Sequence, residues 1–73
     1  MYELIRKSKI GKAVKEVYTD GETWEAIGGV TPNKKFKNKK EILTFLRTLI
    51  DDLTKVSDWE DENYIYTAKK VGE

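Results

Sequence analysis

Residues 38–56 read NKKEILTFLRTLIDDLTKV, and this stretch decides the fold. Asn38, followed three positions later by Glu41, forms a capping box, the side-chain pair that satisfies free amides at the start of a helix. Apolar residues then recur at helical spacing and fill one arc of the helical wheel, while polar residues fill the other. The pattern predicts an amphipathic helix that begins at Asn38, runs to Val56 and packs on a sheet. The apolar positions are Ile42, Leu43, Phe45, Leu46, Leu49, Ile50, Leu53 and Val56.

Three short runs typical of β-strands precede the helix. Residues 2–7 alternate in polarity, and residues 13–19 and 22–27 are rich in β-branched and aromatic side chains. Asp20-Gly21 separates the second run from the third, and Asp-Gly between two such runs is a strong hairpin signal. We therefore expect a three-stranded antiparallel meander, followed by a loop over residues 28–37.

Charges select a register for this hairpin. A two-residue turn would place Glu16 opposite Glu25, an unfavourable like-charge pair. A three-residue turn with Gly21 in the left-handed conformation places Lys15 opposite Glu25 and Glu16 opposite Trp24, and we expect this register. Neither face is uniformly apolar, so the sequence leaves open which face is buried. The expected faces are Ala13, Val17 and Ile27 on one side and Val14, Tyr18, Trp24 and Ala26 on the other.

The segment after the helix adds one more strand. Residues 57–60 (SDWE) repeat the capping pattern and predict a short turn or helix, and residues 64–71 (YIYTAKKV) predict a last strand. The expected fold is a single α+β domain over residues 1–73, with the order β-β-β-α-β. A right-handed crossover would place the last strand parallel to the first and beside it, in a mixed sheet of order 3-2-1-4.

Composition excludes several kinds of chemistry. The 73 residues are enough for one small domain, and they include no cysteine and no histidine. Thiolate metal sites, disulfides and the commonest general base are therefore absent, and Ser8 and Ser57 have no histidine to activate them. The acidic run from Asp58 to Glu62 lacks the glycine and the oxygen spacing of a calcium loop. We expect no catalytic residue, no cofactor and no metal, and a cytoplasmic chain without a membrane span.

The lysine-rich stretch of residues 34–40 (KKFKNKK) is the main candidate for a binding site. Residues 1–40 carry ten basic and five acidic side chains, whereas residues 41–73 carry four and eight, so we expect an electrically two-sided molecule. Lysines at the start of a helix oppose its dipole, so stability gives no reason for them, and with the free amides they are typical of an anion site. The candidate partner-binding residues are Lys34, Lys35, Phe36, Lys37, Lys39 and Lys40.

Tyr64 and Tyr66 share one face of the last strand and form a second candidate feature, an aromatic stripe. Exposed aromatic rings on strands can stack on single-stranded bases. The leading hypothesis is a small non-catalytic interaction or regulatory protein that occupies a surface of a macromolecular partner. The alternative is a nucleic-acid-binding module that uses the lysine-rich loop and the strand aromatics. The lysine excess over arginine fits an AT-rich bacterial or phage genome, but the sequence identifies neither the partner nor the oligomeric state.

Overall fold

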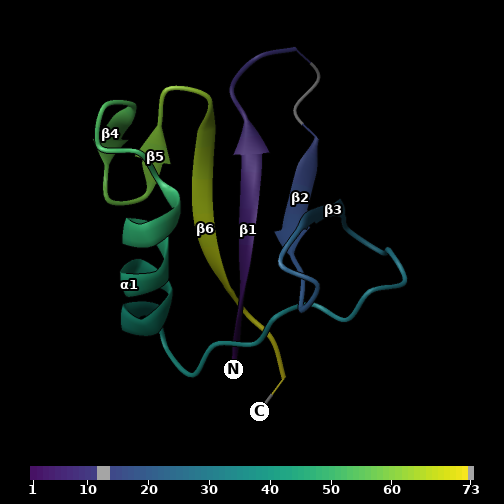
Figure 1. The fold of residues 1–73 in the computed structure, drawn as a ribbon. Helices are drawn as coiled ribbons and strands as arrows, with labels where there is room; N and C mark the ends of the chain where they lie inside the picture. Colours follow the sequence, from purple (N-terminus) through teal and green to yellow (C-terminus); the bar gives the residue numbers. More distant parts are fainter. Residues whose placement is uncertain (12–13, 73) are drawn as a thin grey trace.

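A computed structural model describes residues 1–11 and 14–72 of the chain. One helix lies against one face of a six-stranded sheet in which every pair of neighbours is antiparallel (Figure 1). The sheet order is β3-β2-β1-β6-β5-β4. The elements are β1 (Tyr2–Ser8), β2 (Lys15–Tyr18), β3 (Trp24–Ala26), α1 (Lys39–Leu49), β4 (Lys55–Ser57), β5 (Glu60–Asp61) and β6 (Tyr64–Lys70).

The α+β class with a single helix is confirmed, but the predicted meander is only half of the sheet. The last strand, β6, lies beside β1 as expected. It runs antiparallel to β1, with Tyr2 opposite Lys70 and Ser8 opposite Tyr64, so the parallel orientation and the mixed sheet were wrong. The reason is that the chain leaves α1 into the hairpin β4–β5, which the sequence did not predict, and reaches β6 through a tight turn instead of a crossover.

The start of α1 is as predicted. Asn38 Oδ1 accepts a hydrogen bond from the Glu41 amide at 2.8 Å, and the Glu41 carboxylate lies 3.5 Å from the amide nitrogen of Lys37. The Asn38 cap is confirmed, whereas the Glu41 carboxylate reaches the amide of Lys37, one residue before the cap, instead of the amide of Asn38 that a capping box predicts. Hydrogen bonds across the first turn therefore position the loop of residues 34–37 relative to the helix.

The end of α1 differs from the prediction, because the helix stops at Leu49 instead of Val56. The Asp51 carboxylate accepts a hydrogen bond from the Leu53 amide at 2.9 Å, which offers the backbone a turn in place of a further helical turn. Residues predicted for the apolar arc are consequently in solvent, with Leu53 89% and Val56 59% exposed. The predicted turn at residues 57–60 connects β4 to β5.

The predicted hairpin register was also wrong. Tyr18 lies opposite Trp24 and Glu16 opposite Ala26, so five residues connect β2 to β3. The rings of Tyr18 and Trp24 meet edge to face at 5.2 Å between centroids, an aromatic pair that the charge argument ignored. Ala13 lies outside the described residues.

The connection between β2 and β3 is closed by threonines. The Thr19 amide donates to the Thr23 carbonyl at 2.9 Å, and the Thr19 hydroxyl accepts from the Gly21 amide at 3.2 Å. The left-handed residue is Glu22, with a φ of 59°, and not Gly21 as predicted. Buried Thr19 therefore sets the turn through its side chain, which the Asp-Gly signal does not reveal.

Strand alternation gives the sheet two different faces. We call the face that α1 covers the helix face and the opposite one the open face. The helix face holds the core, while Ile5 and Val17 point to the open face, where the described residues place no helix. The described helix, α1, is neither long enough nor apolar enough to cross a membrane. The buried core residues are Leu4, Tyr18, Phe36, Ile42, Leu46, Ile50 and Tyr66.

Candidate binding groove on the helix face

The lysine-rich loop crosses the sheet near the first residue of β1. Tyr2 and Phe36 exchange two backbone hydrogen bonds of 2.8 Å, which fix the loop against that strand. Phe36, which the sequence placed among the candidate partner-binding residues, is buried in the core. Because the loop pairs with β1, successive side chains alternate in direction: Lys34 and Phe36 line the helix face, whereas Lys35 points to Glu3. The lysines therefore do not form one patch.

Lys34 and Lys35 have different partners. Lys35 forms an ion pair with Glu3, a buried carboxylate that also accepts a hydrogen bond from Asn33 Nδ2 at 3.0 Å. Burial would raise the pKa of Glu3, but the bonds from Lys35 and Asn33 and the charges of Lys35 and Lys69 outweigh it and hold that pKa below its usual range. Lys35 therefore secures the loop to β1, whereas Lys34 forms none of the ion pairs found among the described residues.

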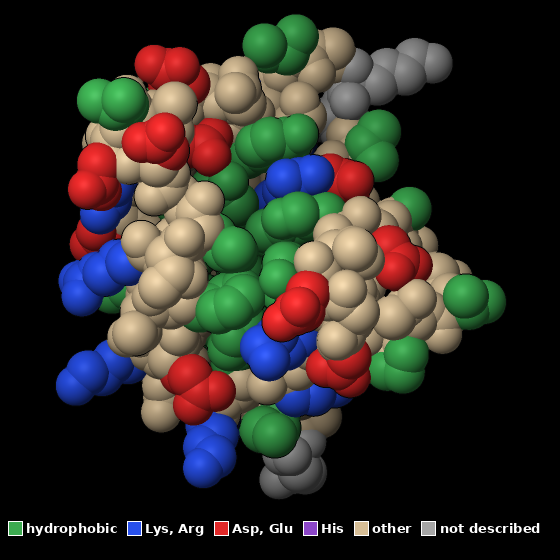
Figure 2. Space-filling view, viewed as in Figure 1, with side chains coloured by type: hydrophobic (Ala, Val, Ile, Leu, Met, Phe, Trp, Pro, Cys, Tyr) green, Lys and Arg blue, Asp and Glu red, His purple; other side chains and the backbone are tan. Residues whose placement is uncertain are grey.

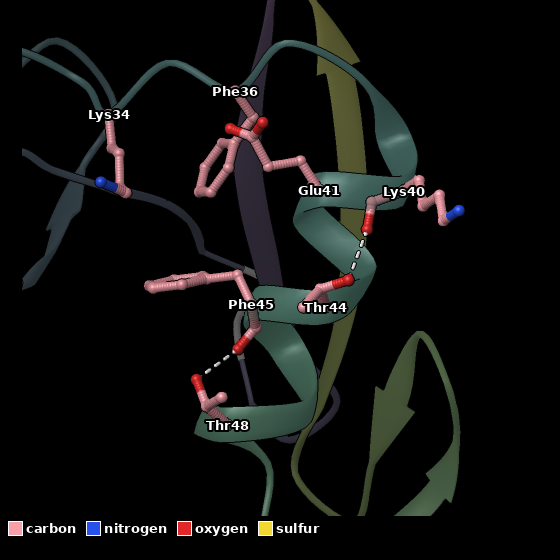
Figure 3. Close-up of a pocket in the computed structure, with 7 residues that line it drawn as sticks. All are labelled: Lys34, Phe36, Lys40, Glu41, Thr44, Phe45 and Thr48. Carbon is pink, nitrogen blue, oxygen red and sulfur yellow. Dashed lines mark hydrogen bonds between the residues drawn. The ribbon is translucent and has the colours of Figure 1, made fainter.

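A groove of about 610 Å³ opens beside Lys34 on the helix face (Figure 3). The Lys34 Nζ atom lies 5.7 Å from the Phe36 ring centroid and 5.9 Å from that of Phe45, within the range of a cation–π contact. In Figure 3 the Lys34 side chain reaches over from the loop, whereas Lys40 points away from the rings. The lining residues are Lys34, Phe36, Lys40, Glu41, Thr44, Phe45 and Thr48.

The helix side of the groove is held by hydrogen bonds within α1. The Thr44 hydroxyl donates to the Lys40 carbonyl at 3.1 Å, and the Thr48 hydroxyl donates to the Phe45 carbonyl at 2.7 Å. Each hydroxyl thereby donates its proton within α1, so it can offer a ligand only an acceptor. The walls of the groove are mainly apolar, and three charged side chains also line it: Lys34, Lys40 and Glu41.

A second cation lies farther along the same face. The guanidinium carbon of Arg6 lies 4.5 Å from the Trp24 ring centroid and 4.1 Å from that of Tyr64, and Arg6 Nε pairs with Glu16 at 2.8 Å. Arg6 follows Tyr2, which contacts the loop, by four residues of β1, or roughly 13 Å along the strand. Figure 2 shows a continuous band of hydrophobic side chains on this face, between α1 and the β2–β3 hairpin.

The predicted aromatic stripe divides into two roles. Tyr66 is buried, and its hydroxyl donates to Asp61 at 2.6 Å, while the half-buried Tyr64 stacks on Arg6. Burial and the neighbouring Asp61 carboxylate raise the pKa of Tyr66. Burial would also raise the pKa of Asp61, but hydrogen bonds from Tyr66, Asn63 and Tyr64 outweigh it and lower that pKa. Tyr66 is therefore core, and Tyr64 is a half-buried residue packed against it.

The other candidate lysines surround the start of α1. Lys37, Lys39 and Lys40 are exposed. The Glu41 amide, which an anion at the helix terminus would use, is already bound by Asn38. Acidic side chains gather over β4 and β5 in Figure 2, and others lie elsewhere on the same face, so the two-sided charge distribution stays a prediction. Within the described ranges, no three carboxylates converge as a metal site requires.

Sequence reasoning missed four residues that define this face. Arg6 was assigned to a strand without a role, and Trp24 was considered only as a strand aromatic that could stack on a base. Thr44 and Thr48 were placed on the polar side of the helix. One signal was available, because Phe45 is the aromatic residue of the apolar arc and lies directly between the threonine-bearing turns. No protein-family model matches the chain, and no curated protein or solved structure shows significant similarity to it.

Proposed function

We propose that this chain is a small non-catalytic interaction domain that holds a segment of a partner protein in the groove between the lysine-rich loop and α1. The observation that carries the proposal is the position of Lys34, whose ammonium lies over the Phe36 and Phe45 rings without a carboxylate partner among the described ion pairs. A segment with an apolar side chain followed by a carboxylate would fit both parts of the groove.

Two physical arguments favour a protein segment. A groove of about 610 Å³ accepts one or two large side chains, and aromatic walls with few fixed polar groups are typical of interface pockets that bind an anchor residue. Lys34 supplies orientation, because a carboxylate near a partly desolvated ammonium gains a charge-assisted hydrogen bond. The groove therefore supports binding of a short acidic-apolar motif.

The experiment is selection from a random twelve-residue peptide library, followed by NMR titration of the selected peptide into the ¹⁵N-labelled protein. We expect enrichment of Leu, Phe or Trp adjacent to Asp or Glu, with amide shifts at Thr44, Phe45 and Thr48. Lys34→Gln should weaken binding about tenfold, the loss of one charge-assisted contact of roughly 1.5 kcal/mol. Thr48→Arg should block the groove sterically.

Leu49→Arg is the matched control, because it places the same side chain at an exposed helical position outside the groove. It should leave peptide binding unchanged. Equal loss in Thr48→Arg and Leu49→Arg, or shifts confined to the open face, would contradict the proposed site. Circular dichroism of every variant separates lost binding from lost folding.

Nucleic-acid binding is the second candidate function, and the exposed Lys37, Lys39 and Lys40 favour it. A single-stranded 20-mer titrated against the same labelled protein tests it. If these lysines contact phosphates, the triple Gln variant reduces the salt slope by about 0.7 for each contact removed. Amide shifts around the start of α1 on addition of the 20-mer, together with a peptide library that yields no selected sequence, would favour nucleic-acid binding over peptide binding.

A further inference from the structure

The open face carries a hollow that the groove does not use. Its floor is Ile5, only 7% exposed, and its walls include Ile65 and Ile27, which are 44% and 51% exposed. The volume is about 360 Å³. Thr67 and three exposed lysines complete its lining, and the lysines come from three neighbouring strands: Lys7 of β1, Lys15 of β2 and Lys69 of β6.

Two of these lysines oppose each other. Lys7 and Lys15 are direct cross-strand partners in the β1–β2 ladder. Like charges at such positions destabilise a sheet, because the Cβ atoms of opposite residues lie only about 5 Å apart. Stability of the domain therefore gives no reason for this pair, whereas a bound anion would relieve the repulsion.

Acidic side chains at the border of the hollow have other partners. Glu3, the cross-strand neighbour of Lys69, is bound by Lys35 and Asn33, and the Lys69 charge acts on it without forming an ion pair. Glu60, opposite Ile65, pairs with Lys9. None of the ion pairs of the described chain includes Lys7, Lys15 or Lys69, and the hollow's lining contains no acid.

We propose that the open face binds an acidic amphipathic helix of a partner protein, with one apolar side chain on Ile5 and carboxylates at Lys7, Lys15 and Lys69. Charge complementarity selects the acidic partner, and the isoleucine walls select an apolar anchor. An added helix would also cover the apolar side chains of this face, as helices cover both faces of a sheet in three-layer domains. This inference does not depend on the groove, which lies on the other face.

Nucleic acid fits this hollow less well. All eight aromatic residues of the chain lie in the helix-face core or pack against it, so the open face offers no ring on which a base could stack. Three lysines alone would contact few phosphates, and isoleucine side chains contribute nothing to a backbone contact. The open face is therefore assigned to a protein helix.

The test uses a designed 18-residue helical peptide with a leucine stripe flanked by glutamates, titrated into the ¹⁵N-labelled protein. We expect shifts at Ile65, Thr67 and Lys69. The matched pair of variants is Lys69→Gln and Lys70→Gln, because these adjacent residues of β6 point to opposite faces and both are exposed. Lys69→Gln should weaken binding about fivefold and Lys7→Gln/Lys15→Gln at least tenfold, whereas Lys70→Gln should have little effect.

Three outcomes would overturn the inference. One is equal weakening by Lys69→Gln and Lys70→Gln, which would indicate attraction to net charge alone. Another is binding of a single-stranded 20-mer, but not of the peptide, with the same shifts. The third is a concentration-dependent dimer in sedimentation that Lys7→Gln/Lys15→Gln stabilises, which would identify a second copy of the chain as the occupant. The peptide selected for the groove should still bind Lys69→Gln and Lys7→Gln/Lys15→Gln, which would show that the groove is intact in these variants.

Discussion

The two faces of the sheet use the same strands and the same kinds of charged residue to different effect. On the helix face, Arg6 lies between two aromatic rings and pairs with Glu16, so its charge is part of the packed structure. On the open face, Lys7 and Lys15 point to the same side from paired positions without an acid between them. A charged side chain alone therefore does not identify a binding surface. Like charges whose repulsion lowers the stability of the fold are a better indication of one.

Truncating one apolar side chain on each face should have the largest and most unequal effects on the free energy of unfolding. Leu4 is fully buried on the helix face, and Ile65 is 44% exposed on the open face. Leu4→Ala should cost about 2–5 kcal/mol, which would leave a domain of this size largely unfolded, whereas Ile65→Ala should cost less than about 1 kcal/mol. Urea unfolding followed by tryptophan fluorescence measures both, and comparable losses would show that the open face is packed too.

Each face also contains one buried carboxylate, Asp61 on the helix face and Glu3 on the open face. Acid titration compares how much each contributes to the stability of the fold. The pKa values of Asp61 and Glu3 are lowered in the folded protein, so each stabilises the fold above its unfolded pKa, near pH 4. That stability is lost as the pH falls through the folded pKa. Asp61→Asn should cost about 2 kcal/mol at pH 7, because two backbone amides lose a charged acceptor.

Glu3→Gln should cost less, because its partners Lys35 and Asn33 are side chains that can turn to solvent. Both variants should show a flatter fall in stability between pH 5 and pH 2 than the parent protein, measured as thermal midpoint against pH. If the thermal midpoint of Asp61→Asn falls with decreasing pH as steeply as that of the parent protein, other carboxylates control acid unfolding.

The smallest expected effect concerns the opposed lysines. Lys15→Glu replaces a like-charge pair with an opposite-charge pair across β1 and β2, so stability should rise by about 0.5 kcal/mol at low salt, and the gain should shrink at 1 M salt. Lys70→Glu serves as the control for net charge. A gain of equal size in the control would remove the argument that Lys7 and Lys15 repel each other.

The sequence predicted features that depend on local patterns. The capping box fixed the start of α1, and the period of two correctly placed Tyr18 and Trp24 on one face and Val17 on the other. Prediction from the sequence failed where contacts between distant residues determine the structure. The Tyr18–Trp24 ring contact set the hairpin register, and Asp51 ended a helix whose apolar pattern continued to Val56. The candidate lysines were chosen by their number, whereas the structure separates Lys34 from Lys35 because the loop pairs with β1 and its successive side chains point in opposite directions.

The central pair of strands also affects how the protein reaches its native state. β1 and β6 come from opposite ends of the described chain, and Tyr2 lies opposite Lys70. Topologies dominated by such distant pairings fold slowly, in milliseconds to seconds. During synthesis, the inner edge of β1 therefore stays unpaired until Lys70 has left the ribosome, and an unpaired edge can join another chain. Aggregation is consequently a greater hazard for the nascent protein than for the finished sheet, in which β1 is covered on both sides.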